Sequence, residues 1–158
     1  MATFPLLFQF QGALIGRGFV AEIEVTGSRV LASIEDTGDV WLYGVNPGAI
    51  AENGDSLEDA NSHFRKAIYE VLIDMAKESR TFGELKAQVE AFFITTNEPV
   101  EVDWKAALAR IRESREKLGD LPVHRVTALK VAVNKKPLKD LRPSDNRPQV
   151  NAALAKVA

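Results

Sequence analysis

The chain has 158 residues, of which 46% are hydrophobic and 27% are charged. This length and balance predict one soluble globular domain, or one domain with an appendage, and allow a core of useful size. The sequence contains no cysteine, which excludes a disulfide framework, thiolate catalysis and any metal site built on sulfur.

The formal net charge of −2 conceals an uneven distribution along the chain. Residues 1–60 carry a net charge of −7, residues 119–158 carry +5, and the stretch between them is balanced. Such asymmetry favours different partners for the two ends, or a tail that folds back on the front. A charge drift without functional meaning is an equally good interpretation.

The apolar N-terminal segment does not have the pattern of a secretory signal. Its first positive charge is Arg17, and Gln9 and Gln11 interrupt the apolar run. No stretch of the chain is long and apolar enough for a membrane span. We therefore expect a cytoplasmic protein.

Alternating apolar and polar residues predict a series of strands in the first third of the chain. The pattern covers residues 4–10, 19–25, 30–35 and 40–45, with a short strand at 49–52. Turns are expected at 26–28, at 36–39 and at Pro47-Gly48. The glycines around Arg17 lack the lysine and hydroxyl of a phosphate-binding loop, so turn or bulge positions are the preferred interpretation.

Three helices are predicted after these strands. Ser56 caps the first, at residues 56–79, and its apolar stripe starts at Leu57. The second starts after Thr81 and ends before Thr95. Asp103 is the expected cap of the third, which Gly119 closes.

The C-terminal part predicts one more strand at 127–133 and then an extended segment. From residue 134 onward the composition is basic and proline-containing, and only the last residues suggest a helical turn. We thus predict an α+β fold, in which an antiparallel sheet of four to six strands packs on one long helix with two further helices. Residues 1–133 form the domain, and residues 134–158 form the C-terminal arm.

Two sets of residues are candidates for binding. The first, for a protein partner, combines the acidic face of one strand with an aromatic pair on another and contains Glu22, Glu24, Trp41 and Tyr43. An exposed aromatic pair would mark an interface, whereas a buried pair would belong to the core, and the core is the favoured interpretation. The second set, for phosphates or for another subunit, comprises Lys130, Lys135, Lys136, Lys139, Arg142 and Arg147. No aromatic side chain is interleaved with these cations, so base recognition is not expected.

Catalytic groups are sparse. His63 lies four residues after Asp59 on a predicted helix, where a surface pair is favoured over a catalytic one because no nucleophile accompanies it. His124 is expected to be solvated. Glu35, Asp36 and Asp39 are candidates for a divalent-ion site, but a solvated acidic hairpin tip is the preferred interpretation. The sequence predicts no enzyme, no cofactor and no metal.

A family resemblance is carried by residues 29–79. This stretch contains a predicted hairpin, Pro47-Gly48, then Gly54-Asp55-Ser56, and a helix that opens with Leu57-Glu58-Asp59-Ala60. It resembles the N-terminal domain of HicB-like antitoxins. The resemblance implies a partial ribonuclease-H-like or double-stranded-RNA-binding-like sheet with one helix across it. It also implies a small basic, messenger-RNA-cleaving toxin as partner, and a separate C-terminal DNA-binding module.

Two features depart from the family pattern. About 28 residues precede the hairpin, and the predicted break between the second and third helices, from Ile94 to Val102 with Pro99 inside it, is too long for a helix-turn-helix. We expect a non-enzymatic HicB-like antitoxin or regulator that binds a protein partner. The alternative is a self-associating structural or assembly protein, for example of a phage-like particle, that uses the C-terminal arm to form a homo-oligomer.

Overall fold

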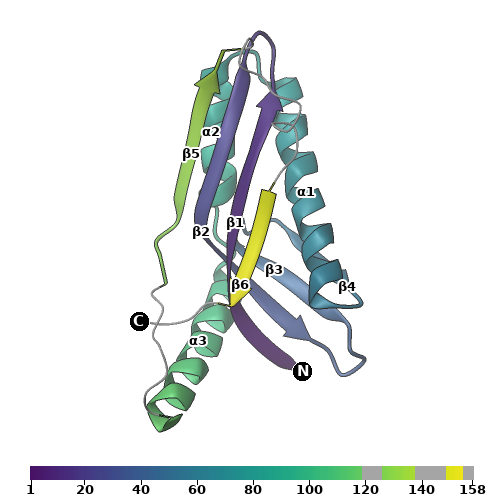
Figure 1. The fold of residues 1–158 in the computed structure, drawn as a ribbon, viewed down its shortest axis with the longest axis vertical. Helices are drawn as coiled ribbons and strands as arrows, with labels where there is room; N and C mark the ends of the chain where they lie inside the picture. Colours follow the sequence, from purple (N-terminus) through teal and green to yellow (C-terminus); the bar gives the residue numbers. More distant parts are fainter. Residues whose placement is uncertain (119–125, 138–148, 155–158) are drawn as a thin grey trace.

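The computed structural model describes residues 1–118, 126–137 and 149–154. A curled antiparallel sheet combines with three helices, which confirms the predicted α+β class (Figure 1). The strands are β1 (Ala2–Ile15), β2 (Val20–Ile34), β3 (Val40–Asn46), β4 (Ala51–Gly54), β5 (Lys130–Lys136) and β6 (Gln149–Leu154). The helices are α1 (Leu57–Glu78), α2 (Phe82–Ile94) and α3 (Glu98–Leu118).

A long hairpin of β1 and β2 forms the middle of the sheet. The strand order is β4-β3-β2-β1-β6, and β5 also pairs with β2. Residues 20–26 of β2 pair with β5, whereas residues 29–34 pair with β3. The same edge of β2 is therefore hydrogen-bonded to two different strands along its length. Figure 1 shows the consequence: β3 and β4 lie at one end of the hairpin and β5 lies at the other.

The predicted turn at residues 26–28 is wrong, because β2 continues through this stretch. Phe10 pairs with Val25 and Phe8 pairs with Ser28, so two residues of β2 face the single residue Gln9. This extra residue makes a β-bulge, and Gly27 supplies the positive φ of 73°. A Cβ at Gly27 would lie 2.2 Å from the carbonyl oxygen of Ala128, so a side chain does not fit there.

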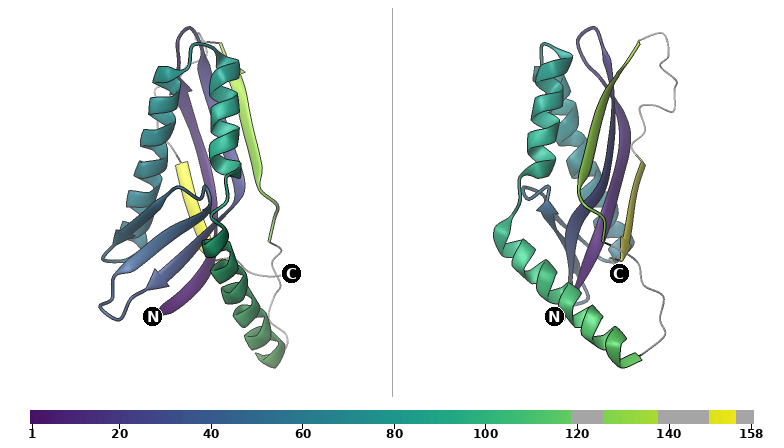
Figure 2. Two further views of the ribbon diagram at one scale, coloured as in Figure 1. Left: turned by 180° about the vertical axis from the view of Figure 1, so that it is seen from behind. Right: turned by 90° about the vertical axis from the view of Figure 1, so that its left-hand side faces the viewer.

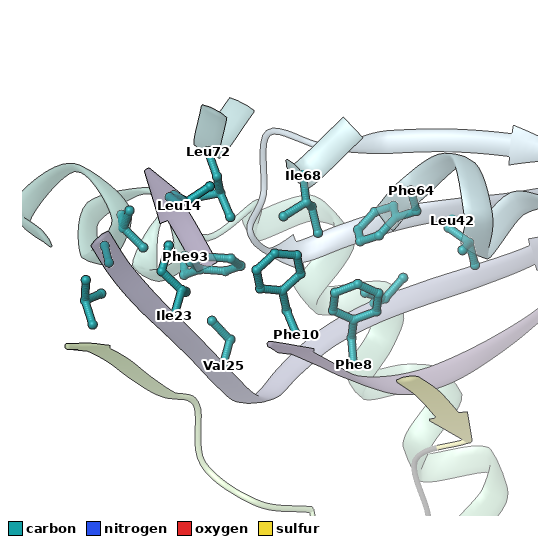
Figure 3. Close-up of a cluster of buried hydrophobic side chains, with 14 of the residues drawn as sticks. Phe8, Phe10, Leu14, Ile23, Val25, Leu42, Phe64, Ile68, Leu72 and Phe93 are labelled. Atoms are coloured by element: carbon teal, nitrogen blue, oxygen red, sulfur yellow. The ribbon is translucent and has the colours of Figure 1, made fainter. Parts of the chain in front are cut away.

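The larger core lies on one face of the sheet, here called the inner face. Figure 2 shows α1 and α2 on this side. Phe8 and Phe10 of β1 meet Phe64 of α1 and Phe93 of α2, and the rings of Phe8 and Phe64 pack edge to face at 5.2 Å (Figure 3). Full burial of each such side chain stabilises the fold by about 1.5–3 kcal/mol. The predicted apolar stripe of α1 thus covers the sheet as expected.

The opposite, outer face carries a smaller core under α3. Trp104 lies at its centre and donates a hydrogen bond from its indole N–H to the carbonyl oxygen of Leu6, at 3.3 Å. Arg29 lies 5.4 Å above the Trp104 ring and forms an ion pair of 2.8 Å with Glu101. The buried cluster also contains Leu31, Val45, Ala107 and Leu108. Both faces of the same strands are therefore covered at this end of the sheet.

The break between α2 and α3 is shorter than predicted. Helix α3 begins at Glu98, not after Asp103, and only residues 95–97 separate it from α2. Pro99 fits because a proline in the first turn of a helix removes no intrahelical hydrogen bond. The side chain of Asn97 accepts from the backbone N–H of Val100 at 3.3 Å and so helps to start the helix. The two helices cover opposite faces of the sheet instead of packing on each other.

Two predictions for the end of the chain need correction. The expected boundary at residues 133/134 falls inside β5, whose pairing with β2 extends to Lys136. The expected helical turn near the C-terminus is also wrong, because residues 149–154 form β6, antiparallel to residues 6–11 of β1. Part of the C-terminal arm thus belongs to the sheet.

Candidate functional site

A groove with a volume of 680 Å³ opens at the end of the sheet where α1 begins. We call it the α1 groove. Its floor consists of side chains from the ends of β1, β2 and β3, and the first turn of α1 forms one wall. The volume lies in the range of sites that bind ligands or side chains. The lining residues are Phe4, Leu6, Ala32, Ile34, Val40, Leu57, Glu58 and Asn61.

The local sequence explains why the groove stays open. The first large side chain of α1 that reaches the inner core is Phe64, and between the helix start and Phe64 only the small Ala60 is buried. Leu57, which was predicted to continue the apolar stripe into the core, is instead 47% exposed. Phe4 and Ile34 across the groove are each 38% exposed. Three large apolar side chains thus face solvent at one place, which is typical of an interaction site.

The surroundings of the α1 groove are acidic. Glu58 lines the groove and Asp55 lies just before the N-cap residue Ser56, while the loop that joins Ile34 to Val40 carries Glu35, Asp36 and Asp39. We call these five carboxylates the acidic rim, in which Asp36 forms an ion pair of 2.8 Å with the N-terminal ammonium of Met1. None of the lining residues is basic. Glu58 forms no ion pair with any residue in the described part of the chain. A cationic ligand is therefore favoured here.

Side-chain capping occupies backbone donors at the start of α1. The side chain of Ser56 accepts from the N–H of Asp59 at 3.0 Å, and Asp59 in turn accepts from the N–H of Asp55 at 3.1 Å. This reciprocal capping occupies donors that would otherwise bind a phosphate or carboxylate. The predicted cap is thus present.

Asn61 contributes a polar atom to the wall of the α1 groove. Its side-chain carbonyl oxygen is buried and has no hydrogen-bond partner among the residues that the structure describes. A buried acceptor without a donor is costly, by about 1–3 kcal/mol. A donor brought by a ligand, after rotation of this side chain, would remove that cost.

The predicted aromatic pair lies outside the inner core. Val40 and Leu42 point into the inner core, whereas Trp41 and Tyr43 lie half-buried on the outer face with their rings stacked at 5.8 Å. Tyr43 packs against the cluster under α3. The favoured core interpretation therefore holds for Tyr43 only in part, and the contact shown for the Trp41 ring is its stacking on Tyr43.

The other predicted binding residues that the structure describes lie on two neighbouring strands, β2 and β5. Glu22 and Glu24 lie on the outer face of β2, where Lys136 of β5 reaches Glu22 at 3.3 Å. Lys130 and Lys135 are exposed on β5. Lys139, Arg142 and Arg147 lie outside the described residues, as does His124. The ion pair between Lys136 and Glu22 joins the basic end of the chain to its acidic front.

The groups considered for chemistry have structural partners. His63 lies 3.6 Å from Asp59 in the predicted pair, and its Nδ1 lies 2.7 Å from the carbonyl oxygen of Asn53, which ties α1 to β4. At the hairpin tip, Glu35 accepts from Ser33 and Asp39 accepts from Thr37. Across residues 1–118, 126–137 and 149–154, no group of three or more His, Cys, Asp or Glu side chains is arranged to hold a metal ion.

The α1 groove was not predicted as a site. Each of its apolar residues has the pattern of an ordinary strand or helix position, and only the fold brings Phe4, Ile34 and Leu57 together. A signal was present in the charges, because Glu35, Asp36, Asp39, Asp55 and Glu58 follow closely along the sequence. Without the structure, nothing connected these acids with an apolar floor.

Comparison with protein-family models, curated proteins and solved structures finds no match for this chain. Among the described residues, no helix has the length and apolar character needed to cross a membrane.

Proposed function

We propose that this chain is a non-enzymatic HicB-like antitoxin or regulator that acts by binding a basic protein partner. The observation that carries the proposal is the α1 groove, in which exposed apolar side chains lie beside the acidic rim. Apolar contacts supply binding free energy, and carboxylates around them favour a cationic partner and speed its association.

The local architecture of residues 29–79 supports the relationship. The end of β2 pairs with β3, Pro47-Gly48 follows in a turn, and Ser56 caps a helix that opens at Leu57. This is the order of elements on which the resemblance to HicB-like antitoxins rests. These elements also frame the groove, because β2, β3 and α1 supply most of its lining.

Co-purification tests the proposal. An affinity-tagged chain is co-expressed with the small basic protein encoded in the adjacent reading frame, and the complex is isolated by size exclusion. We expect a stable complex whose affinity falls as salt rises, because charges contribute to it. A neighbouring basic protein that elutes separately from the tagged chain at low salt would contradict the proposal.

Self-association through the C-terminal arm is the second candidate function. The observation that favours it is the position of β6 at the edge of the sheet, where, among the described strands, it pairs only with β1. A strand held by a single neighbour can pair with the same edge of another copy. We expect removal of residues 137–158, which leaves β5 complete, to lower the molar mass in light scattering. An unchanged mass with unchanged circular dichroism would remove this candidate.

A further inference from the structure

We propose that the α1 groove is the docking site for a basic amphipathic helix of a protein partner, which inserts apolar side chains between Phe4, Ile34 and Leu57. This inference rests on the proposed function and adds the surface, the kind of segment and the chemistry of recognition.

The arrangement of charge around the groove favours a helix with basic flanks. Glu58 lines the groove on the α1 side with Asp55 just before that helix, and the acids of the 35–39 loop follow the strand end at Ile34, where the Met1 ammonium pairs with Asp36. An apolar stripe flanked by lysine or arginine on both sides would place its apolar residues on the floor and its cations near both groups of carboxylates. The same charges disfavour nucleic acid and anionic membranes, which repel carboxylates.

The adjacent edge of β1 argues against an added strand. Pro5 lies between the groove-lining residues Phe4 and Leu6, and proline has no backbone N–H to donate to a new ladder. Proline at a sheet edge is one of the devices that prevent strand addition. Recognition by side chains inserted from a helix does not require that donor.

Asn61 supplies a polar contact within the apolar wall. Its orphan carbonyl oxygen can accept from a lysine ammonium or an arginine guanidinium of the docked helix once the side chain rotates. Glu58, three residues earlier and one turn away on the same helix, provides the countercharge.

The test measures binding by fluorescence anisotropy at low salt. The probe is a labelled peptide of about 18 residues in which Leu recurs at helical spacing and Lys fills the other positions. We expect Glu58→Lys to weaken binding about tenfold and Leu57→Ala about fivefold. Matched controls are Glu78→Lys, at the other end of α1, and Val102→Ala, an exposed apolar residue of α3; both should bind as the wild type does.

Three results would overturn the inference. The first is equal affinity of the Glu58→Lys and Glu78→Lys variants for the probe. The second is binding of a peptide with Glu in place of Lys that equals binding of the probe. The third is binding of anionic phospholipid vesicles that is as sensitive to Glu58→Lys as peptide binding is. Circular dichroism melts of all four variants establish that each remains folded.

The same variants separate this inference from the proposed function. If the basic neighbour co-purifies with the wild type but also, undiminished, with the Glu58→Lys and Leu57→Ala variants, the docking site is wrong and the function stands. If the wild type does not bind the neighbour and the peptide still binds at the groove, the proposed partner is wrong and the docking chemistry stands.

Discussion

The two faces of the sheet are closed in different ways. On the inner face, α1 and α2 cover five buried phenylalanine side chains, Phe8, Phe10, Phe19, Phe64 and Phe93, with many aliphatic neighbours. On the outer face, α3 covers only one end with a small cluster around Trp104. The inner face depends on apolar area, which is non-directional, whereas the outer face adds a hydrogen bond, a cation–π contact and an ion pair at defined positions.

This difference explains where the fold can carry a binding site with little loss of stability. The inner core is filled in its middle, and its larger opening lies at the margin where α1 begins, ahead of Phe64, the first large buried residue of that helix. A groove at that margin leaves most of the apolar area intact. The groove residues and the inner-core residues thus occupy adjacent but separate parts of the contact between α1 and the sheet. Variants can test whether binding depends on the first set and stability on the second.

The largest effect is expected inside the inner core. Phe64→Ala removes a ring that is fully buried and packed edge to face on Phe8, so we expect a loss of about 3–5 kcal/mol in the free energy of unfolding. Chemical denaturation measures this change. Phe4→Ala, at the partly exposed groove, is the matched control and should cost about 1 kcal/mol or less. Equal costs for the two variants would mean that the groove is part of the core.

The next effect is expected on the outer face. Trp104→Ala should lower the free energy of unfolding by about 3 kcal/mol, because it removes the centre of the cluster and its hydrogen bond to Leu6. Trp104→Phe keeps most of the packing and should lose about 1 kcal/mol, the contribution of the hydrogen bond. If Trp104→Phe is no more stable than Trp104→Ala, the stability of the outer cluster depends on the polar contacts more than on packing.

The smallest effect is a dependence on pH. The hydrogen bond from Arg29 lowers the pKa of Glu101 below its ordinary value of 4.5, against the opposing effect of partial burial. A carboxyl with a lowered folded-state pKa stabilises the fold above 4.5, and this contribution disappears as the pH falls through the folded-state pKa. Wild-type stability should therefore fall more steeply than that of Glu101→Gln below pH 4.5. The free energy of unfolding is measured by denaturant titration at each pH. A decrease of equal steepness for the wild type and Glu101→Gln would contradict this prediction.

Much of the architecture was predictable from local patterns. The cap at Ser56, the apolar stripe of α1 and the glycine of the 36–39 hairpin all depend on residues close in sequence, and the structure has each of them. Predictions failed where one local sequence pattern is compatible with two different backbone structures. Thr26-Gly27-Ser28 suits a turn as well as a bulge, and Pro99 suits the first turn of a helix as well as a break.

The amino-acid sequence by itself determined the helices, most strands and the acidic front, because periodicity, capping and charge are properties of neighbouring residues. Only the tertiary structure decided that β2 continues through Gly27, that β5 and β6 return to the central hairpin, and that α2 and α3 take opposite faces. It alone brought Phe4, Ile34 and Leu57 together beside Glu58. Such juxtapositions depend on pairing between residues far apart in sequence, which no local pattern specifies.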